Sequence, residues 1–159
     1  MCGVLPDVEV EPRLLPYVEE QLAGQTANRA VDARVDIRAK GFWTRQQEAF
    51  FDVRVTHPKA TLSSRSEALA QLASHEREKK RQYAERIRII DRGSFTPLVF
   101  STMGMASQEC TMMLKTLVHR FVEKNNDLRF ATVMNFLRTR LSLCLLRWNI
   151  TCLGGSRSS

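Results

Sequence analysis

The feature that most constrains the fold is a long run, Ser66–Asp91, which contains no glycine or proline and is rich in strong helix formers. Apolar side chains recur in it at helical spacing, and Gly93 follows as a stop. The members of this apolar stripe are Ala68, Leu69, Leu72, Tyr83, Ile87 and Ile90. The pattern predicts one long amphipathic helix in the middle of the chain.

Strand-like segments lie on both sides of this helix. Arg34–Ala39 alternates charged and apolar residues, and Ala49–Thr56 is aromatic and β-branched with charges at alternate positions. Phe95–Ser101 is a further strand candidate, and Val8–Leu15 is a short one interrupted by Pro12. Strands that alternate with helices in this way predict an α/β layer fold.

Two further helices are expected at the C-terminal side, over Ser107–Lys124 and Asp127–Leu153. The first is expected to place Cys110, Met113, Leu114, Leu117, Val118 and Phe121 on one side. In the second, Leu141, Leu145, Trp148 and Cys152 recur at three- and four-residue spacing and are expected to be buried. We expect residues 1–153 to form one domain and residues 154–159 a disordered tail.

Composition narrows the class of protein. The 159 residues carry a net charge of +7, with six acidic and two basic residues in 1–33, and eight basic and two acidic residues in 113–159. A basic excess favours phosphate-rich partners such as DNA. Cys110, Cys144 and Cys152 lie in apolar helical stretches without metal-ligand spacing, so we expect free thiols inside the cell. No signal peptide or membrane-length apolar run is present in the sequence, and a membrane role is not expected.

Two aspartates are the candidate chemical centre. Asp36 lies in the middle of one predicted strand and Asp52 in the middle of the next, joined by a connection of hairpin size that contains Gly41. If the strands pair as antiparallel neighbours, both carboxylates can lie on one face and share a divalent cation such as Mg²⁺. The other interpretation is that both are exposed strand residues paired with Arg34 and Arg54.

The long helix offers the basic partner that a metal-dependent phosphodiesterase needs. Glu76, Lys80 and Tyr83 share one helical face and Lys79 borders it. A lysine can lose its proton when it is partly desolvated, whereas an arginine cannot. We therefore expect Lys80, rather than Lys79 or Arg54, to reach the carboxylates. The alternative is that both lysines are solvated and Tyr83 belongs to the core.

The segments V-D-I, F-F-D-V-R-V and E-K-K-x-x-Y, in this order, resemble the restriction-like endonuclease domain at the C-terminal end of some non-long-terminal-repeat retrotransposon polyproteins. That domain belongs to the P-D…[DE]-x-K nuclease superfamily, and the similarity covers roughly Val8 to Ser158. It implies a restriction-endonuclease-like mixed sheet with flanking helices and two C-terminal helices. It also implies that the chain is N-terminally truncated, with the first helix of such a domain missing.

By this resemblance Asp36 and Asp52 are the metal ligands, and Lys79 or Lys80 with Tyr83 completes the catalytic set. We expect Arg38, Arg54, Arg77 and Arg81 to bind DNA. The sequence departs from the motif at Val35, where the family has proline, and at Arg54, where the superfamily has lysine. Either the lysine has moved to the helix or the site is damaged.

The resemblance implies a magnesium-dependent endonuclease that nicks target DNA in the nucleus, so that the reverse transcriptase of the same element can prime on the exposed 3′ end. One alternative is a non-catalytic DNA-binding or assembly module that keeps the fold. Another is a helical adaptor that uses Met134–Leu153 as its partner surface and binds no metal.

Overall fold

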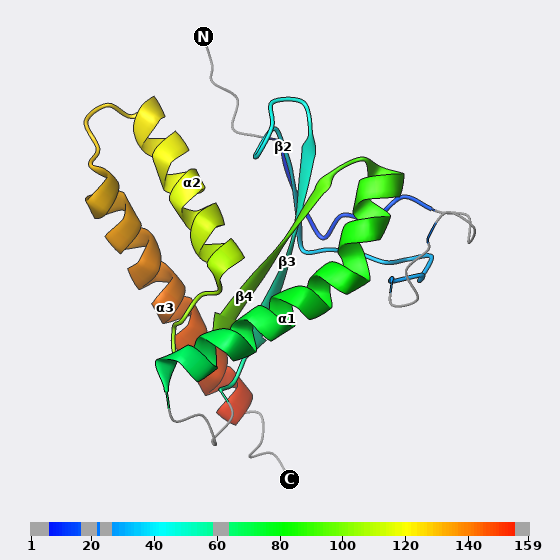
Figure 1. The fold of residues 1–159 in the computed structure, drawn as a ribbon. Coiled ribbons are helices and arrows are strands. Elements are labelled where there is room, and N and C mark those ends of the chain that lie inside the picture. The colour runs from blue at the N-terminus through cyan, green and yellow to red at the C-terminus, as the bar shows by residue number, and fades with distance from the viewer. Residues whose placement is uncertain (1–6, 17–21, 23–26, 59–63, 155–159) are drawn as a thin grey trace. The chain divides into compact units, whose positions relative to one another are not determined.

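The structure, a computed structural model, describes residues 7–16, 22, 27–58 and 64–154. The elements follow the order β1, β2, β3, α1, β4, α2, α3 (Figure 1). The chain divides into two compact units, one made of residues 1–54 and 73–98 and the other of residues 55–72 and 99–159. The two units are described separately below.

The four strands form one mixed sheet in the order β1-β2-β3-β4. They comprise β1 (Val8–Val10), β2 (Ile37–Lys40), β3 (Glu48–Thr56) and β4 (Ser94–Ser101). Both β1 and β3 pair with β2 in antiparallel fashion. The chain passes from β3 to β4 through α1 (Arg65–Arg86), the helical crossover that parallel neighbours require. The expected α/β class is therefore confirmed at the level of a mixed sheet with helices.

The first strand is shorter than the pattern Val8–Leu15 predicted. It ends at Val10 because Glu11 adopts a positive φ of 53° and Pro12 has no amide hydrogen to donate. Beyond this break, contact with the neighbouring segment continues only locally. Arg13 forms an isolated bridge with Arg34, and the Leu14 amide donates to the Ala33 carbonyl at 2.9 Å.

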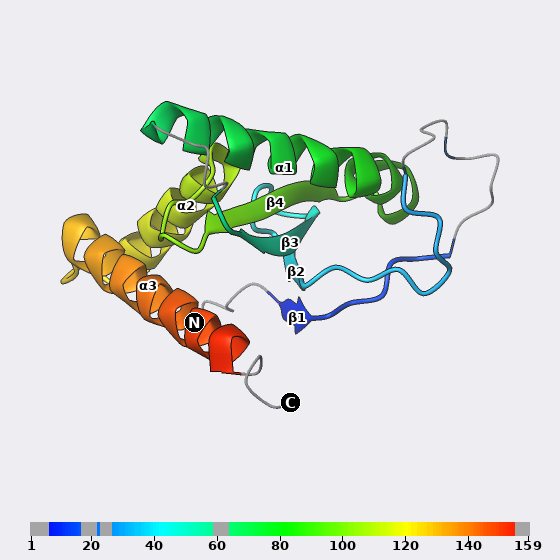
Figure 2. The same ribbon diagram turned by 90° about the horizontal axis from the view of Figure 1, so that it is seen from below.

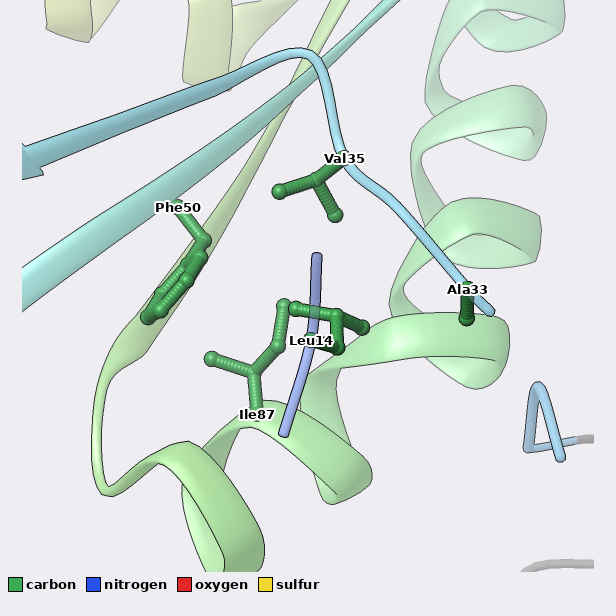
Figure 3. Packing of buried hydrophobic residues seen from close by; sticks show 5 residues of the cluster. All are labelled: Leu14, Ala33, Val35, Phe50 and Ile87. Atoms are coloured by element: carbon green, nitrogen blue, oxygen red, sulfur yellow. The ribbon is translucent and has the colours of Figure 1, made fainter. Parts of the chain in front are cut away.

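The first unit has a compact apolar core (Figure 3). Its buried members come from the irregular segments beside β1 and β2, from β3 and from the end of the central helix: Leu14, Ala33, Val35, Phe50 and Ile87. Tyr83 and Phe95 pack against this cluster with their rings 5.5 Å apart. The core therefore joins the C-terminal part of α1 to the sheet, which fixes the helical residues that face β3.

The central helix ends differently from its prediction over Ser66–Asp91. The α-helical part stops at Arg86, and Ile87–Asp91 forms a π-helical turn. Arg92 ends this turn in the left-handed region with φ of 52°. Gly93 then lies so close to β3 that a Cβ atom there would be 2.5 Å from the Phe50 ring and 2.8 Å from the Glu48 carbonyl oxygen.

The second unit contains the helical hairpin of α2 (Gln108–Lys124) and α3 (Phe130–Gly154), which lie side by side in both views (Figures 1 and 2). Cys110, Leu114 and Val118 of α2 are buried, as is Met134 of α3. No helix among residues 7–16, 22, 27–58 and 64–154 has the length and hydropathy that a membrane span needs.

The prediction that the last helix buries Leu141, Leu145, Trp148 and Cys152 is wrong in part. Leu141 and Leu145 are half-buried and Trp148 is exposed, while the Cys152 side chain lies outside the described residues. Cys144 is exposed and Cys110 is buried, and both are free thiols. Besides α2, α3 contacts the segment after β4, where the Asn149 side-chain amide donates to the Thr102 carbonyl at 3.2 Å. The periodic apolar residues of α3 extend beyond these contacts.

Candidate functional site

Asp36 lies near Asp52, just before β2 begins. The register of the antiparallel pair runs from Ile37 opposite Phe51 to Lys40 opposite Glu48, so Asp36 immediately precedes β2 and does not lie in the middle of a strand as predicted. The Asp36 amide donates to the Phe51 carbonyl at 3.1 Å, and the charge of Asp36 contributes to the raised pKa of Asp52, so the two carboxylates lie near each other. The prediction that these two strands are adjacent and antiparallel is confirmed.

The Asp36 carboxylate is held against β3. Its Oδ2 atom accepts a hydrogen bond of 2.6 Å from the Val53 amide, the residue that follows Asp52. A backbone donor directed at a carboxylate fixes its position. Asp36 is therefore anchored next to Asp52 by the strand itself.

Asp52 is buried more deeply than Asp36, and only 8% of its side chain is exposed. Its Oδ2 atom lies 2.6 Å from Nζ of Lys79. Burial raises the pKa of Asp52, although the Lys79 ammonium opposes this rise, and the nearby negative charge of Asp36 adds to it. Two carboxylates and one ammonium thus share a small, partly desolvated volume.

The lysine that reaches Asp52 is Lys79, whereas Lys80 was the expected one. The Lys79 side chain is 18% exposed, and its ammonium also lies over the Tyr83 ring, 5.5 Å from the centroid. In an α-helix both position 79 and position 80 border the line from Glu76 to Tyr83, at about 60° and 40° from Glu76. The spacing of these residues in the sequence could not distinguish Lys79 from Lys80. The rotation of α1 about its own axis, as it packs on β3, directs Lys79 toward Asp52.

Tyr83 is held in place by contacts that the sequence did not reveal. Its hydroxyl accepts a hydrogen bond of 3.2 Å from the Asn28 side-chain amide, and the Asn28 backbone amide donates to the Gln82 carbonyl at 2.7 Å. The Phe95 ring packs against the other part of Tyr83. Tyr83 therefore contacts both Lys79 and the core. It lies beside the candidate site, as the resemblance implies, and it also packs in the core, as the alternative interpretation holds.

The expected DNA-binding arginines divide into two kinds. Arg54 pairs with Glu78 of α1 at 2.7 Å, and this hydrogen bond is the main cause of a lowered pKa at Glu78. Arg38 pairs with Glu9 and, at 3.4 Å, with Glu48. In contrast, Arg77 and Arg81 lie exposed on α1. Arg77 and Arg81 therefore present their charge to solvent, whereas Arg38 and Arg54 each contact a carboxylate of the chain.

Arg86 is a buried residue that sequence reasoning missed. Its guanidinium donates to the carbonyl oxygens of Asn28 and Ala30 at 2.9 and 2.7 Å and to that of Leu15 at 3.2 Å. A basic residue three positions after Tyr83, on the apolar stripe of a helix, was the available signal. Arg86 and Asn28 connect residues 28–30 to α1 by hydrogen bonds. They therefore position Tyr83 and, through Tyr83, Lys79.

The two carboxylates of the candidate site are as many as a magnesium ion usually takes from a protein. Within the described ranges no group of three or more His, Cys, Asp or Glu side chains could hold a metal ion. Magnesium, however, is usually bound by one or two carboxylates and completes its shell with water and phosphate oxygens. Asp36 and Asp52 provide two such carboxylates near each other.

Comparison with known proteins gave no match to this chain, whether with family models, curated proteins or solved structures.

Proposed function

We propose that this chain is a magnesium-dependent endonuclease domain that cuts one strand of DNA at the Asp36/Asp52 pair. The observation that carries the proposal is the ion pair of Lys79 with the buried Asp52, near Asp36, whose carboxylate the Val53 amide holds against β3. Adjacent carboxylates with a lysine beside them are the combination that metal-assisted phosphodiester hydrolysis needs. The sequence resemblance supports the same function and assigns the fold to the restriction-endonuclease-like class.

Asp36 and Asp52 would hold the metal ion, which when bound would polarise the scissile phosphate and lower the pKa of an attacking water. Before the ion binds, Lys79 balances the charge of Asp52 at 2.6 Å. Its ammonium can then donate hydrogen bonds to a phosphate oxygen of the substrate. Tyr83 limits the freedom of Lys79 by lying against it.

The wider setting of the proposal also comes from the resemblance. A nicking domain of a retrotransposon protein would act in the nucleus, with DNA as substrate and the reverse transcriptase of the same element as partner. Arg77 and Arg81 are exposed on α1, the helix that carries Lys79, and are suited to phosphate contacts. Arg54 and Arg38 would have to exchange a carboxylate partner for a phosphate.

The test is conversion of supercoiled plasmid to the nicked form in Mg²⁺. We expect Asp36→Asn and Asp52→Asn to lower the rate at least ~100-fold. Loss of a residue that only orients a metal ligand costs roughly 10–100-fold, and loss of a ligand itself should cost at least as much. Lys79→Met should lower it similarly, whereas Lys80→Met should retain most of the rate. Asp91→Asn is the matched control, because Asp91 is a second aspartate of the same unit whose pKa is raised by burial. Equal nicking by Asp52→Asn and the parent protein would refute the proposal.

A non-catalytic DNA-binding or assembly module is the second candidate. It is favoured by one observation: Lys79, Arg54 and Arg38 each pair with a carboxylate of the chain itself. In such pairs the cation already has an anionic partner and would have to leave it to contact a scissile phosphate. This candidate predicts DNA binding that weakens steeply with salt, without nicking at any Mg²⁺ concentration, and equal binding by the parent and Asp52→Asn.

A further inference from the structure

The hairpin of α2 and α3 carries an apolar groove that the proposed nuclease site does not use. It encloses about 440 Å³ between the C-terminal half of α2 and the first part of α3. Its lining includes Leu117 and Phe121 of α2, Leu128 of the connection, and Val133, Phe136 and Leu137 of α3. Nearly the whole lining is apolar, which distinguishes it from a site that binds a small charged ligand.

The groove exposes large side chains to water. Phe136 is 66% exposed, Phe121 47% and Leu117 41%. A contiguous apolar surface of this kind on an otherwise charged chain is typical of a protein–protein contact. Two packed helices with a furrow between them offer the ridges and grooves into which a third helix can fit.

Basic side chains border the groove. The Arg140 guanidinium carbon lies 6.0 Å from the centroid of the Phe136 ring, so this cation stands directly at the groove wall. Lys124 follows Phe121 by three residues and Arg129 follows Leu128, and both are exposed. From Leu117 to Arg140 the chain has five basic residues and two acidic ones, Glu123 and Asp127, a net charge of +3.

From the apolar floor and the basic border together we infer that this groove binds an amphipathic helix of another polypeptide. That helix presents apolar residues at three- and four-residue spacing toward Phe121 and Phe136. Acidic residues flank its apolar face and meet Lys124, Arg129 and Arg140, so opposite charges fix its orientation. A second copy of the same hairpin is a poorer occupant, because it would bring the same three cations against themselves.

The binding test uses two synthetic helical peptides with the same Leu and Phe positions. One carries glutamate on both flanks and the other carries lysine at those positions. Measured by fluorescence anisotropy, the parent protein should bind the acidic peptide at least ~10-fold more tightly than the basic one, a difference of about 1.4 kcal/mol. Arg140→Glu should reduce or reverse this preference.

Two variants on one helix separate the groove from general apolar exposure. Phe136→Asp should weaken binding of the acidic peptide at least ~10-fold, since it places a like charge on the groove wall. Ile150→Asp is the matched control, because Ile150 is equally exposed at 69% on α3 but does not line the groove. Both positions are exposed, so neither substitution should prevent folding, which circular dichroism checks.

Four results would overturn the inference. Equal affinity for both peptides, or equal weakening by Phe136→Asp and Ile150→Asp, would mean that the groove does not select its ligand. Self-association of the parent protein in sedimentation, abolished by Phe136→Asp, would assign the groove to a second copy. Duplex DNA that displaces the acidic peptide and is itself lost in Phe136→Asp would assign it to nucleic acid.

Discussion

At the scale of single residues, the pair of Asp52 and Lys79 costs the fold more than an apolar pair would. Burial of a carboxylate removes its hydration, and the attraction of one ammonium seldom exceeds that loss by much. The raised pKa of Asp52, despite Lys79 at 2.6 Å, agrees with a net penalty on the charged form. A purely structural role therefore explains the residues poorly, while a site that needs carboxylates explains them well.

This energetic argument predicts the effect of separating the pair. Lys79→Met should lower the free energy of unfolding by about 2 kcal/mol, less than the 3–5 kcal/mol of a fully buried pair because Lys79 keeps some exposure. The double variant Asp52→Asn/Lys79→Met should regain at least half of this loss, since no uncompensated charge remains. Lys80→Met is the adjacent control and should cost less than about 1 kcal/mol. Urea unfolding measures these proteins together with Asp52→Asn, and additive losses in the double variant would contradict the account.

Asp91 gives a prediction about pH. Its Oδ1 atom accepts a hydrogen bond from the Leu15 amide at 3.0 Å, and burial is the main cause of its raised pKa. Between its ordinary pKa of 3.8 and this raised value, the folded protein binds more protons than the unfolded chain. The contribution of Asp91 to stability is therefore present below pH 3.8 and is lost as the pH rises through the raised pKa.

An asparagine at this position keeps the acceptor but does not titrate. The Asp91→Asn variant should lack this component of the pH dependence, so its stability relative to the parent should rise across that window. Denaturant unfolding at several pH values from 3.5 to 7 measures the difference. A constant difference between the two proteins over this range would show that Asp91 does not titrate as the structure indicates.

At the scale of elements, periodicity predicted most of the architecture. The long helix, the hairpin strands and the two C-terminal helices all lie near their expected ranges, because each presents a local apolar pattern that tertiary packing reinforces. The errors have identifiable causes. Val8–Leu15 breaks at Glu11, whose positive φ no pattern indicates, and the π-helical turn at Ile87–Asp91 depends on how α1 meets the core.

The turn between this π-helical segment and β4 is a testable element. Gly93→Ala should destabilise the protein by about 1–3 kcal/mol, because its Cβ atom would collide with the buried Phe50 ring and the Glu48 carbonyl oxygen. Arg92→Gly should have the opposite sign, a gain of up to about 1 kcal/mol, since Arg92 adopts a left-handed conformation that glycine tolerates. Thermal unfolding compares these neighbouring changes, and a neutral Gly93→Ala would contradict the close approach of this turn to β3.

At the scale of the whole molecule, the candidate site combines local and distant information. The antiparallel pairing of the two strands near Asp36 and Asp52 followed from the alternation of both segments, and the register confirms it. The choice of Lys79 over Lys80 and the anchoring of Tyr83 by Asn28 require the phase and position of α1, which are set by contacts between residues far apart in sequence. Pairing also decides which cations are open to an external phosphate, since Arg38 and Arg54 already contact acids of the chain.

The central claim is that Asp36 and Asp52 together form a site for a divalent cation. Isothermal titration calorimetry of Mg²⁺ into the parent protein, into Asp36→Asn, into Asp52→Asn and into Asp91→Asn tests it directly. The account predicts one bound ion in the parent and in Asp91→Asn, accompanied by a higher melting temperature, and loss of this binding in the other two variants. Absence of binding in the parent, or equal binding in all four proteins, would contradict it.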